Sequence, residues 1–557
     1  MKRRAGKRKQ WFETLTLIGL ILLAAGLSST YLRRPIEHFD ADEAIVGLMG
    51  RHILRGHIPA YFYGQGYMGS LEALVAAGWF ALLGPSITAL KLAPLTFYLL
   101  FLFLQYRLVR RYSRAGTALL TLAITIVFSP VAILWATKAR GGFTAALFWG
   151  TALSLLFFPL LDRYMEGRKP GWGRLVILGL TAGIGYWNCA LTAYYFFPIS
   201  VYLLVCSLSE IEKFFRPPKK TRNNRGEKTF KKNVITIIEV ILPFVCIYAL
   251  FGLMVIFFGE IRFSLFGLTV SSHHGDRDLL RGSAILALLL IGRGWLGYGF
   301  TGLFHRGRRF GSRFPRLTTL ATVSLIWLAV TSAVDIYFHS IPDYSYGHYT
   351  SLAAAGDWES AGENFEILFR LLLPNVIGVS RVSFKLDLGA NPLTRFASRI
   401  NGATAAAAVV FVFFYLIVAF IRGRNVRNDF IRRHRLSIFF LGSFIGCLLA
   451  LTATAQIKDT TAYRYLIPVI SWLPFFLAVL IMTLWKAWKP AGAVLALLVL
   501  GGHILKLGPL VYGPEPTAPE PQLAEIMADL EKEGINRIYA HYWIAYPIVF
   551  LSGEEII

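Results

Sequence analysis

The chain has 557 residues, of which 55% are hydrophobic and 16% are charged, and its formal net charge is +25. A soluble protein of this size could not bury so much apolar surface, whereas repeated runs of about 20 apolar residues are typical of a multi-span membrane protein. The four cysteines lie inside apolar runs without CxxC spacing, so they indicate neither a disulfide framework nor a zinc site.

The basic residues gather in short segments between the apolar runs. Seven such segments hold 36 of the 57 basic residues but only 6 of the 32 acids: 1–10, 107–114, 162–174, 210–233, 305–316, 422–435 and 486–489. Short loops rich in Lys and Arg mark the cytoplasmic side of a membrane. The net charge therefore reports membrane topology and gives no support to nucleic-acid binding.

The apolar runs predict an all-α polytopic membrane protein. Residues 1–12 form a basic cytoplasmic N-terminus, and the run at 13–31 is an uncleaved anchor and not a signal peptide, because a helical bundle follows it. A transmembrane bundle of about 13 helices is predicted over 13–511. Its spans fall near 13–31, 87–106, 115–136, 143–161, 175–189, 190–208, 234–258, 283–304, 317–337, 401–421, 436–456, 465–485 and 491–511. This places the protein in the cell (inner or plasma) membrane, with its N-terminus cytoplasmic and its C-terminus extracytoplasmic.

Two large outer loops follow from this map, at 32–86 and 338–400. In the first loop, residues 43–55 predict a short amphipathic helix that Asp40 or Asp42 caps. Residues 70–84 are apolar but are too few for a span, so we expect a helix at the membrane interface. If that stretch crossed the membrane instead, every later basic loop would lie outside, which the charge distribution rejects.

The C-terminal segment, 512–557, begins with the Pro-rich linker "GPEPTAPEPQ". The stretch "LAEIMADLEKEGINRIYAHYWIAY" that follows predicts a helix, a glycine stop and then a strand, as in a small α/β unit. The chain ends soon after "GEEII", so we expect an extracytoplasmic α/β domain or an incomplete part of one.

Three carboxylates, Asp40, Asp42 and Glu43, lie within four residues of the first outer loop. In one interpretation they are helix-start residues that favour the positive end of the helix dipole. In the other, a carboxylate at the membrane surface is a general base for an acceptor hydroxyl, and nearby cations neutralise a phosphate leaving group. Candidate cations at outer span ends are Lys138, Arg140 and Arg464, for which interfacial anchoring is the structural alternative.

The "DE" pair, the amphipathic helix and "YFYGQGYMGSLEALVAAGWFALLG" resemble the GT-C superfamily of membrane glycosyltransferases. The similarity is to the protein O-mannosyltransferase and lipid A aminoarabinose transferase group, and "RYLIPVISWLPFFLAVLI" at 464–481 resembles a late segment of those enzymes. It extends over most of residues 11–511. It implies a GT-C-type bundle and a polyprenyl-phosphate-linked sugar donor used at the outer face of the cell envelope.

The resemblance also implies roles for individual residues. Asp42 matches the catalytic aspartate, Glu43 is its acidic neighbour, and Asp40 is a rival or a helper. Arg464 is the candidate for the lipid phosphate. The residues assigned to substrate binding are Tyr63, Gln65, Tyr67, Glu72, Lys138, Arg140, Arg464 and Tyr465.

One departure from the family concerns metal. Many members carry a further acid in the outer loop between the third and fourth spans, where this chain reads "ATKARGGFTAAL" with Lys138 and Arg140. This argues against a divalent cation held between two acidic loops, so no certain cofactor is predicted and a divalent cation stays open as the less favoured alternative. The loop "SSHHGDRD" (271–278) favours a solvated loop over a metal site, because adjacent histidines usually point in different directions.

The sequence therefore predicts an inverting glycosyltransferase that moves a sugar from a polyprenyl-phosphate donor to a hydroxyl of a protein, lipid or glycan acceptor. Its partners are then the lipid-linked donor, the acceptor and membrane lipids. Two alternatives stay open: a transporter or flippase of lipid-linked glycans, which would need ionisable residues within spans, and a non-catalytic scaffold for envelope assembly.

Overall fold

The computed structural model describes residues 2–33, 39–168, 171–215, 261–265, 268–272, 285, 315–339, 358–379, 382–383, 386–387, 392–422, 427–453, 457, 460–512 and 520–557. Two of the predicted spans, 234–258 and 283–304, lie outside these residues apart from residue 285.

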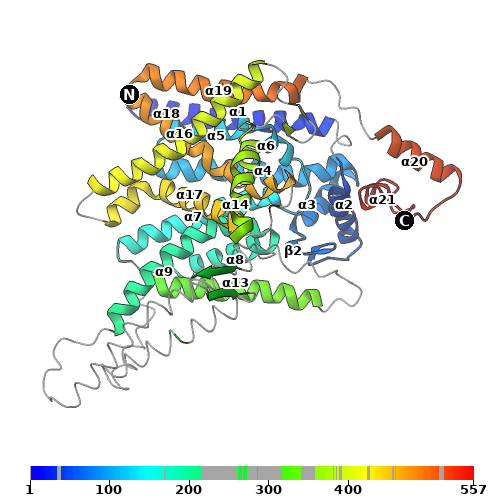
Figure 1. Ribbon diagram of the computed structural model, residues 1–557, viewed down its shortest axis with the longest axis horizontal. Helices are drawn as coiled ribbons and strands as arrows, with labels where there is room; N and C mark the ends of the chain where they lie inside the picture. Colours follow the sequence, from blue (N-terminus) through cyan, green and yellow to red (C-terminus); the bar gives the residue numbers. More distant parts are fainter. Residues whose placement is uncertain are drawn as a thin grey trace, which may run out of the picture.

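Long apolar helices make up most of the described structure and run roughly parallel to one another (Figure 1). Nine of the described helices are long and apolar enough to cross a membrane: α1 (Lys2–Arg33), α4 (Ile87–Tyr112), α7 (Phe143–Met165), α9 (Ala193–Phe215), α13 (Pro315–His339), α16 (Pro392–Arg422), α17 (Arg427–Ala453), α18 (Val469–Ala487) and α19 (Lys489–Tyr512). The predicted all-α multi-span fold is confirmed.

Two further predicted spans correspond to helices that are shorter than these nine. The span expected at 175–189 is α8 (Trp172–Asn188), and the span expected at 115–136 is broken into α5 (Ala115–Val127) and α6 (Pro130–Trp135). The break has a local cause. The Ser129 hydroxyl accepts a hydrogen bond from the Ala132 backbone N–H, and Pro130 occupies the first turn of α6, so a new helix starts there.

The interior of the bundle is packed with aromatic and branched side chains. The rings of Phe157 and Phe158 on α7 lie against Phe439 of α17, with centroids 5.4 and 5.3 Å from its centroid. The ring centroids of Tyr195 on α9 and Trp472 on α18 are 5.0 Å apart.

Short elements connect the long helices. Apart from those of the first outer loop and the tail, they are a 3₁₀ turn (Ala190–Thr192), β3 (Ile261–Leu265), β4 (Leu268–Ser272), α14 (Trp358–Ile367), a π turn (Leu368–Leu372), α15 (Leu373–Val376), β5 (Val382–Ser383), β6 (Leu386–Asp387) and a second 3₁₀ turn (Thr460–Leu466).

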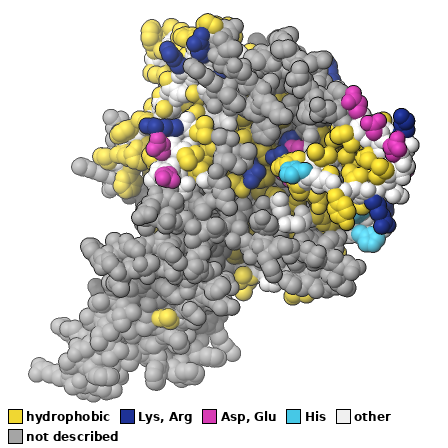
Figure 2. All heavy atoms as spheres, turned by 45° about the vertical axis from the view of Figure 1, so that its right-hand side comes forward, with side chains coloured by type: hydrophobic (Ala, Val, Ile, Leu, Met, Phe, Trp, Pro, Cys, Tyr) yellow, Lys and Arg dark blue, Asp and Glu magenta, His cyan; other side chains and the backbone are white. Residues whose placement is uncertain are grey.

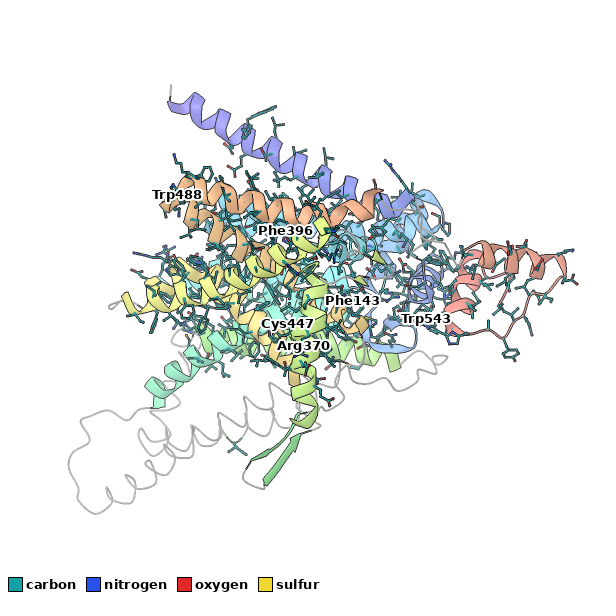
Figure 3. The ribbon with its side chains drawn as sticks, turned by 45° about the horizontal axis from the view of Figure 1, so that its top comes forward. Phe143, Arg370, Phe396, Cys447, Trp488 and Trp543 are labelled. Atoms are coloured by element: carbon teal, nitrogen blue, oxygen red, sulfur yellow. The ribbon has the colours of Figure 1, made fainter. Side chains whose placement is uncertain are left out.

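The two ends of the bundle differ in their connections. The described turns between α4 and α5, α7 and α8, and α18 and α19 lie at the same end as the N-terminus, and these are basic turns of the sequence. Figure 3 shows Trp488 at this end and Trp543 at the other. We call these the basic end and the tail end of the bundle.

The first predicted outer loop is folded at the tail end. It forms α2 (Ala41–Leu54), the hairpin of β1 (Tyr61–Phe62) and β2 (Gln65–Gly69), and α3 (Leu71–Leu83). The predicted helix therefore starts two residues earlier than expected, and Asp40 is its cap, accepting from the Glu43 backbone N–H at 3.2 Å. With 13 residues, α3 is too short to span a bilayer.

The tail departs from its predicted helix–strand order. The helix α20 (Glu520–Lys532) and the glycine stop at Gly534, whose φ is +65°, are as predicted. Residues 535–541 form no regular secondary structure, and two of them bond to the final residue: Ile538 N–H donates to Ile557 C=O and Ile557 N–H donates to Asn536 C=O, both at 2.9 Å. The rest of the predicted strand is instead the helix α21 (Tyr542–Leu551).

Helix α21 packs directly on α2. The Phe550 ring lies so close to Gly47 that a Cβ atom there would come within 2.5 Å of it, and the Arg51 guanidinium lies 4.6 Å from the Phe550 centroid. The first turn of α21 exposes Trp543 and Ile544 and leaves Tyr542 partly exposed. Figure 2 shows hydrophobic side chains over this part of the surface, with acidic side chains along its outer edge.

Candidate functional site

The three carboxylates at the start of α2 meet the loop that joins α6 to α7. This loop, residues 137–142, brings Lys138 and Arg140 to the acids. The Lys138 Nζ lies 2.7 Å from Asp40 Oδ2 and 2.8 Å from Glu43 Oε2. Two of the predicted substrate-binding cations and all three predicted catalytic acids therefore form one cluster, which we call the acid–cation site.

Asp40 is the most strongly paired of the three acids. Arg140 donates from both Nε, at 3.1 Å, and Nη2 to Asp40 Oδ2, while Lys138 binds the same oxygen. Burial by itself raises the pKa of the Asp40 carboxyl, but Lys138 and Arg140 outweigh it and hold that pKa well below its usual range. Asp40 is therefore a fixed anion that also caps α2.

Glu43 lies deeper and is fully buried. It accepts from Lys91 Nζ of α4 at 2.9 Å, from Lys138 Nζ at 2.8 Å, and from the Ala139 backbone N–H at 3.2 Å. A buried carboxylate needs such partners, because an unpaired charge is costly away from water. Glu43 thus locks α2, α4 and the 137–142 loop together.

Asp42 differs from its two neighbours. Its Oδ2 lies 3.6 Å from Arg140 Nε, a weaker contact than those of Asp40, although the two aspartate side chains are about equally exposed. Its Oδ1 accepts a hydrogen bond of 2.7 Å from the hydroxyl of Tyr542 on α21. Burial, and then the nearby Asp42 charge, raise the pKa of the Tyr542 hydroxyl, so Tyr542 is protonated and is the donor. Of the three acids, Asp42 is the one placed to receive a hydroxyl proton.

Glu72 binds the backbone of the 137–142 loop, which carries Lys138 and Arg140. Its Oε2 accepts from the backbone N–H groups of Gly141, at 2.6 Å, and Gly142, at 3.0 Å. Both glycines have positive φ, +80° and +98°, which other residues rarely adopt. Burial raises the pKa of Glu72 to about 8, against the opposing effect of these two hydrogen bonds. With 1% exposure, Glu72 has a structural contact here, and a contact with substrate stays a prediction.

The predicted residues Arg464 and Tyr465 approach the cluster from the second 3₁₀ turn. Arg464 Cζ lies 5.1 Å from the Tyr465 ring, and its Nη2 donates to the Tyr465 hydroxyl at 3.3 Å. The neighbouring Tyr463 hydroxyl accepts from Trp135 Nε1 at 3.3 Å, and the Arg140 guanidinium lies 6.0 Å from the Trp135 ring. Trp135 therefore links the 463–465 segment to the acid–cation site.

The hairpin residues lie on the other side of α2. The Tyr63 hydroxyl is 2.8 Å from His52 Nδ1, and His52 Nε2 is 3.2 Å from Glu554 Oε2 in the tail. Glu554 also pairs with Arg55 at 2.7 Å. Gln65 is part-buried in β2; the backbone of Tyr67 also lies in β2, and its side chain lies outside the described structure. Tyr63 therefore borders the C-terminal turn of α2, whereas the three acids lie at the N-terminal end of that helix.

Sequence reasoning missed two members of the site. Lys91 interrupts the apolar run "ITALKLAPL", and a lysine inside a predicted span is a signal for a buried partner. No sequence pattern indicated Tyr542, because only the packing of α21 on α2 brings its hydroxyl to Asp42. The histidines of the 271–278 loop lie outside the described residues, and within the described residues no group of His, Cys, Asp and Glu side chains could hold a metal ion.

The fold and this cluster define a helical, multi-span integral membrane protein with a buried acid–cation site at one end of its bundle. No protein-family model and no curated protein sequence matches the chain. Among solved structures it is similar to the apo form of the oligosaccharyltransferase of Archaeoglobus fulgidus, with 14% identity and a TM-score of 0.44 over 95% of this chain. The match spans 60% of the length of that chain, and a similarity at this level does not define a family or a function.

Proposed function

We propose that this protein is an inverting GT-C-type glycosyltransferase that moves a sugar from a polyprenyl-phosphate donor to an acceptor hydroxyl. The observation that carries the proposal is the position of Asp42. Its carboxylate accepts a hydrogen bond from a hydroxyl, that of Tyr542, and lies beside Arg140. Inversion needs a general base on the attacked face of the anomeric carbon and cations for the leaving phosphate on the opposite face, and this one cluster contains both kinds of group.

In the proposed reaction, the acceptor oxygen attacks the anomeric carbon and its proton passes to Asp42. The bond between that carbon and the phosphate oxygen breaks on the opposite face, so the configuration inverts. Arg140 and Lys138, with Arg464, then balance the charge of the departing polyprenyl phosphate, for which a guanidinium fork is well suited. The electron pair of the broken bond goes to the phosphate oxygen and the acceptor proton goes to Asp42, so no covalent sugar–enzyme intermediate is needed.

The two paired acids have a different role from Asp42. Asp40 and Glu43 are ion-paired to Arg140, Lys138 and Lys91, so they fix the cations and are not available as bases. Preorganised charges cost no rearrangement during the reaction, which is why buried pairs suit a transfer site. This favours Asp42 over Asp40 as the base.

The membrane orientation follows from the charge distribution. Basic turns lie at one end of the bundle and the acid–cation site at the other. If the basic end is cytoplasmic, the site faces outward, where a lipid-linked sugar and a protein, lipid or glycan acceptor can meet. Lys91 is an ionisable residue within a span, as a transporter would require, but its salt bridge to Glu43 assigns it to this site.

The test is sugar transfer by the purified protein from radiolabelled polyprenyl-phosphate sugars to a membrane extract. We expect turnover by the wild type and a rate about 10²–10⁴-fold lower for Asp42→Asn, which keeps the shape and removes the basicity. Folding is checked by size-exclusion chromatography and donor binding. An active Asp42→Asn with an inactive, folded Asp40→Asn would exchange the two roles.

Full activity in both variants would make these carboxylates helix caps. Absence of transfer by the wild type, together with movement of the lipid-linked donor across liposome bilayers, would favour the flippase alternative.

A further inference from the structure

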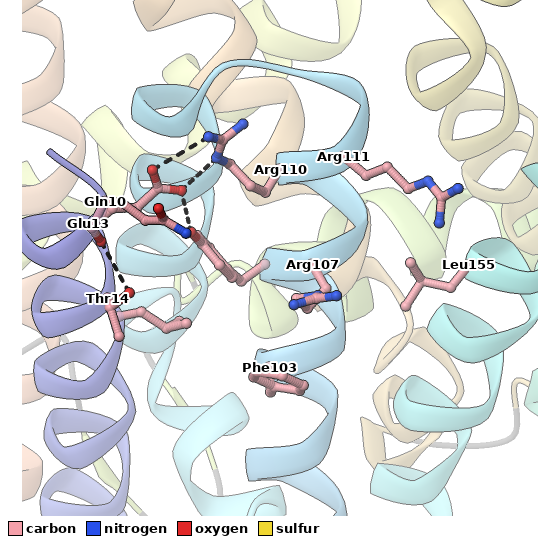
Figure 4. Close-up of a pocket in the computed structure, with 10 residues that line it drawn as sticks. Gln10, Glu13, Thr14, Phe103, Arg107, Arg110, Arg111 and Leu155 are labelled. Carbon is pink, nitrogen blue, oxygen red and sulfur yellow. Dashed lines mark hydrogen bonds and ion pairs between the residues drawn. The ribbon is translucent and has the colours of Figure 1, made fainter. Parts of the chain in front are cut away.

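A polar cavity lies at the basic end, far along the bundle from the acid–cation site. It has a volume of about 940 Å³ and is bounded by α1, α4 and α7. Figure 4 shows Glu13 on α1 and three arginines on α4, with Arg110 reaching toward Glu13 and Arg111 extending toward Leu155 of α7. The arginines at 107, 110 and 111 share one helix face because residues three and four apart are neighbours.

One of the three arginines is held by an acid. Arg110 Nε pairs with Glu13 Oε1, and the Tyr106 hydroxyl donates to the same oxygen. Arg107 and Arg111 instead lie near aromatic rings, 6.0 Å from Phe103 and 5.7 Å from Tyr112, and neither has a carboxylate partner among the described residues. The cavity lining thus carries three positive charges and one negative charge, a net charge of +2.

The cavity also has an apolar side. Leu17, Phe103 and Leu155 line it together with the arginines, and Phe103 is 43% exposed. The candidate spans of α1 and α4 are Gln10–Arg33 and Ile87–Tyr112, so the arginines lie in the last turns of α4 and beside the first turns of the α1 span. In a bilayer this is the level of the headgroups, with the apolar wall toward the acyl chains.

We propose that this cavity binds the phosphate headgroup of an anionic membrane phospholipid, with an acyl chain along Phe103 and Leu155. Charge and position together support a lipid and not a soluble anion. Arginines that merely anchor a helix at the interface extend singly into the headgroups. Here three converge on one cavity, and Glu13 and Tyr106 hold one of them in place. The inference does not depend on the proposed glycosyltransferase activity.

The test is native mass spectrometry of the detergent-purified full chain, titrated with phosphatidylglycerol or phosphatidylcholine of the same acyl chains. Wild type should retain phosphatidylglycerol preferentially. The double variant Arg107→Gln/Arg111→Gln should bind it roughly 25-fold more weakly, since each arginine near a phosphate contributes about fivefold. The charge-matched control Arg168→Gln/Arg174→Gln alters exposed arginines flanking the turn between α7 and α8, outside the cavity, and should bind like the wild type.

Equal losses in the two double variants would show general charge attraction and overturn the site. Equal retention of both lipids by the wild type would also overturn it. Displacement of bound phosphatidylglycerol by millimolar inorganic phosphate would identify a soluble-anion site in place of a lipid site. Thermal unfolding of each variant in neutral detergent verifies that the fold is intact, since these arginines are exposed and their replacement should leave it unchanged.

Discussion

The two ends of this bundle use the same kinds of side chain in opposite ways. At the tail end, Lys91 and Lys138 are almost completely buried and are bound by carboxylates at hydrogen-bond distance. At the basic end, Arg107 and Arg111 are exposed and have aromatic contacts instead of carboxylate partners in the described structure. The buried, paired cations are held in place by the fold before any ligand binds, whereas the exposed arginines can still change conformation when a ligand binds.

This difference has a measurable consequence. Charges in a low-dielectric interior interact strongly and are little affected by salt, while exposed charges are screened within about 10 Å at 0.1 M salt. Substitutions at the acid–cation site should therefore change stability under all conditions. Substitutions of Arg107 and Arg111, in the cavity at the basic end, should change only lipid binding.

The largest effect should come from Glu43→Gln. It removes the negative charge between two buried ammonium groups, and Lys91 then has no anion among its described contacts. Breaking a buried pair typically costs about 3–5 kcal/mol. We expect a strongly lowered midpoint in thermal unfolding followed by tryptophan fluorescence.

The control is Glu43→Gln/Lys91→Met, which also removes the stranded ammonium and should recover much of the loss. If the single variant is as stable as the wild type, Glu43 does not anchor the site. If the double variant is no better than the single one, the cost is due to something other than the unpaired lysine.

Much of this comparison could be predicted from the sequence. Basic residues between apolar runs marked one end of the bundle, and the cluster "DADE" marked the site at the other end. The cap was predicted as either Asp40 or Asp42 from their place before a periodic apolar segment, and Asp40 is the cap in the structure. These features depend on residues close in the sequence, which is why periodicity and capping rules reach them.

What the sequence could not predict depends on long-range packing. The pairing of Glu43 with Lys91 and Lys138 joins residues 48 and 95 positions apart. The contact of Tyr542 with Asp42 joins residues 500 positions apart. The break before α6 is a different case, because its serine cap and proline are local signals that the span prediction over 115–136 did not use.

The next effect in size concerns pH and Glu72. Its pKa is raised to about 8 in the fold from an ordinary value of 4.5, so between these values the folded chain keeps a proton that the unfolded chain has lost. The contribution of Glu72 to the free energy of unfolding is therefore fully present below about pH 4.5 and is lost as the pH rises to about 8. The loss is a few kcal/mol at most, at about 1.4 kcal/mol per pKa unit.

Glu72→Gln should remove this part of the pH dependence and be the more stable form near pH 8. Unfolding midpoints measured from pH 5 to pH 9 check it. Parallel profiles for the two proteins would mean that Glu72 is ionised in the folded state.

A smaller effect is expected for Tyr542→Phe, which removes the hydroxyl that donates to Asp42. Tyr542 is 36% exposed, so the loss should be about 1 kcal/mol, or roughly fivefold in the local opening equilibrium of α21. Hydrogen exchange over residues 542–551 measures it. Tyr546→Phe is the matched control, because its hydroxyl has no hydrogen bond in the described structure, and it should exchange like the wild type. Equal exchange in all three would show that the apolar contacts of Phe550 alone hold α21.

The smallest effect should be that of Arg111→Gln on stability in neutral detergent. Its guanidinium is exposed and lies against Tyr112 without a carboxylate partner in the described chain, so the free energy of unfolding should change by less than about 0.5 kcal/mol. Phosphatidylglycerol should reveal a difference, because a ligand that binds only the folded state stabilises it according to its affinity, and the variant should gain less than the wild type. Arg140→Gln is the counterpart at the tail end: it removes one of the two described cations that bind the part-buried Asp40, leaving Lys138, and it should be destabilised with or without that lipid. An Arg111→Gln protein that is destabilised in neutral detergent would show that this arginine is part of the fold, and the contrast between the two ends would then fail.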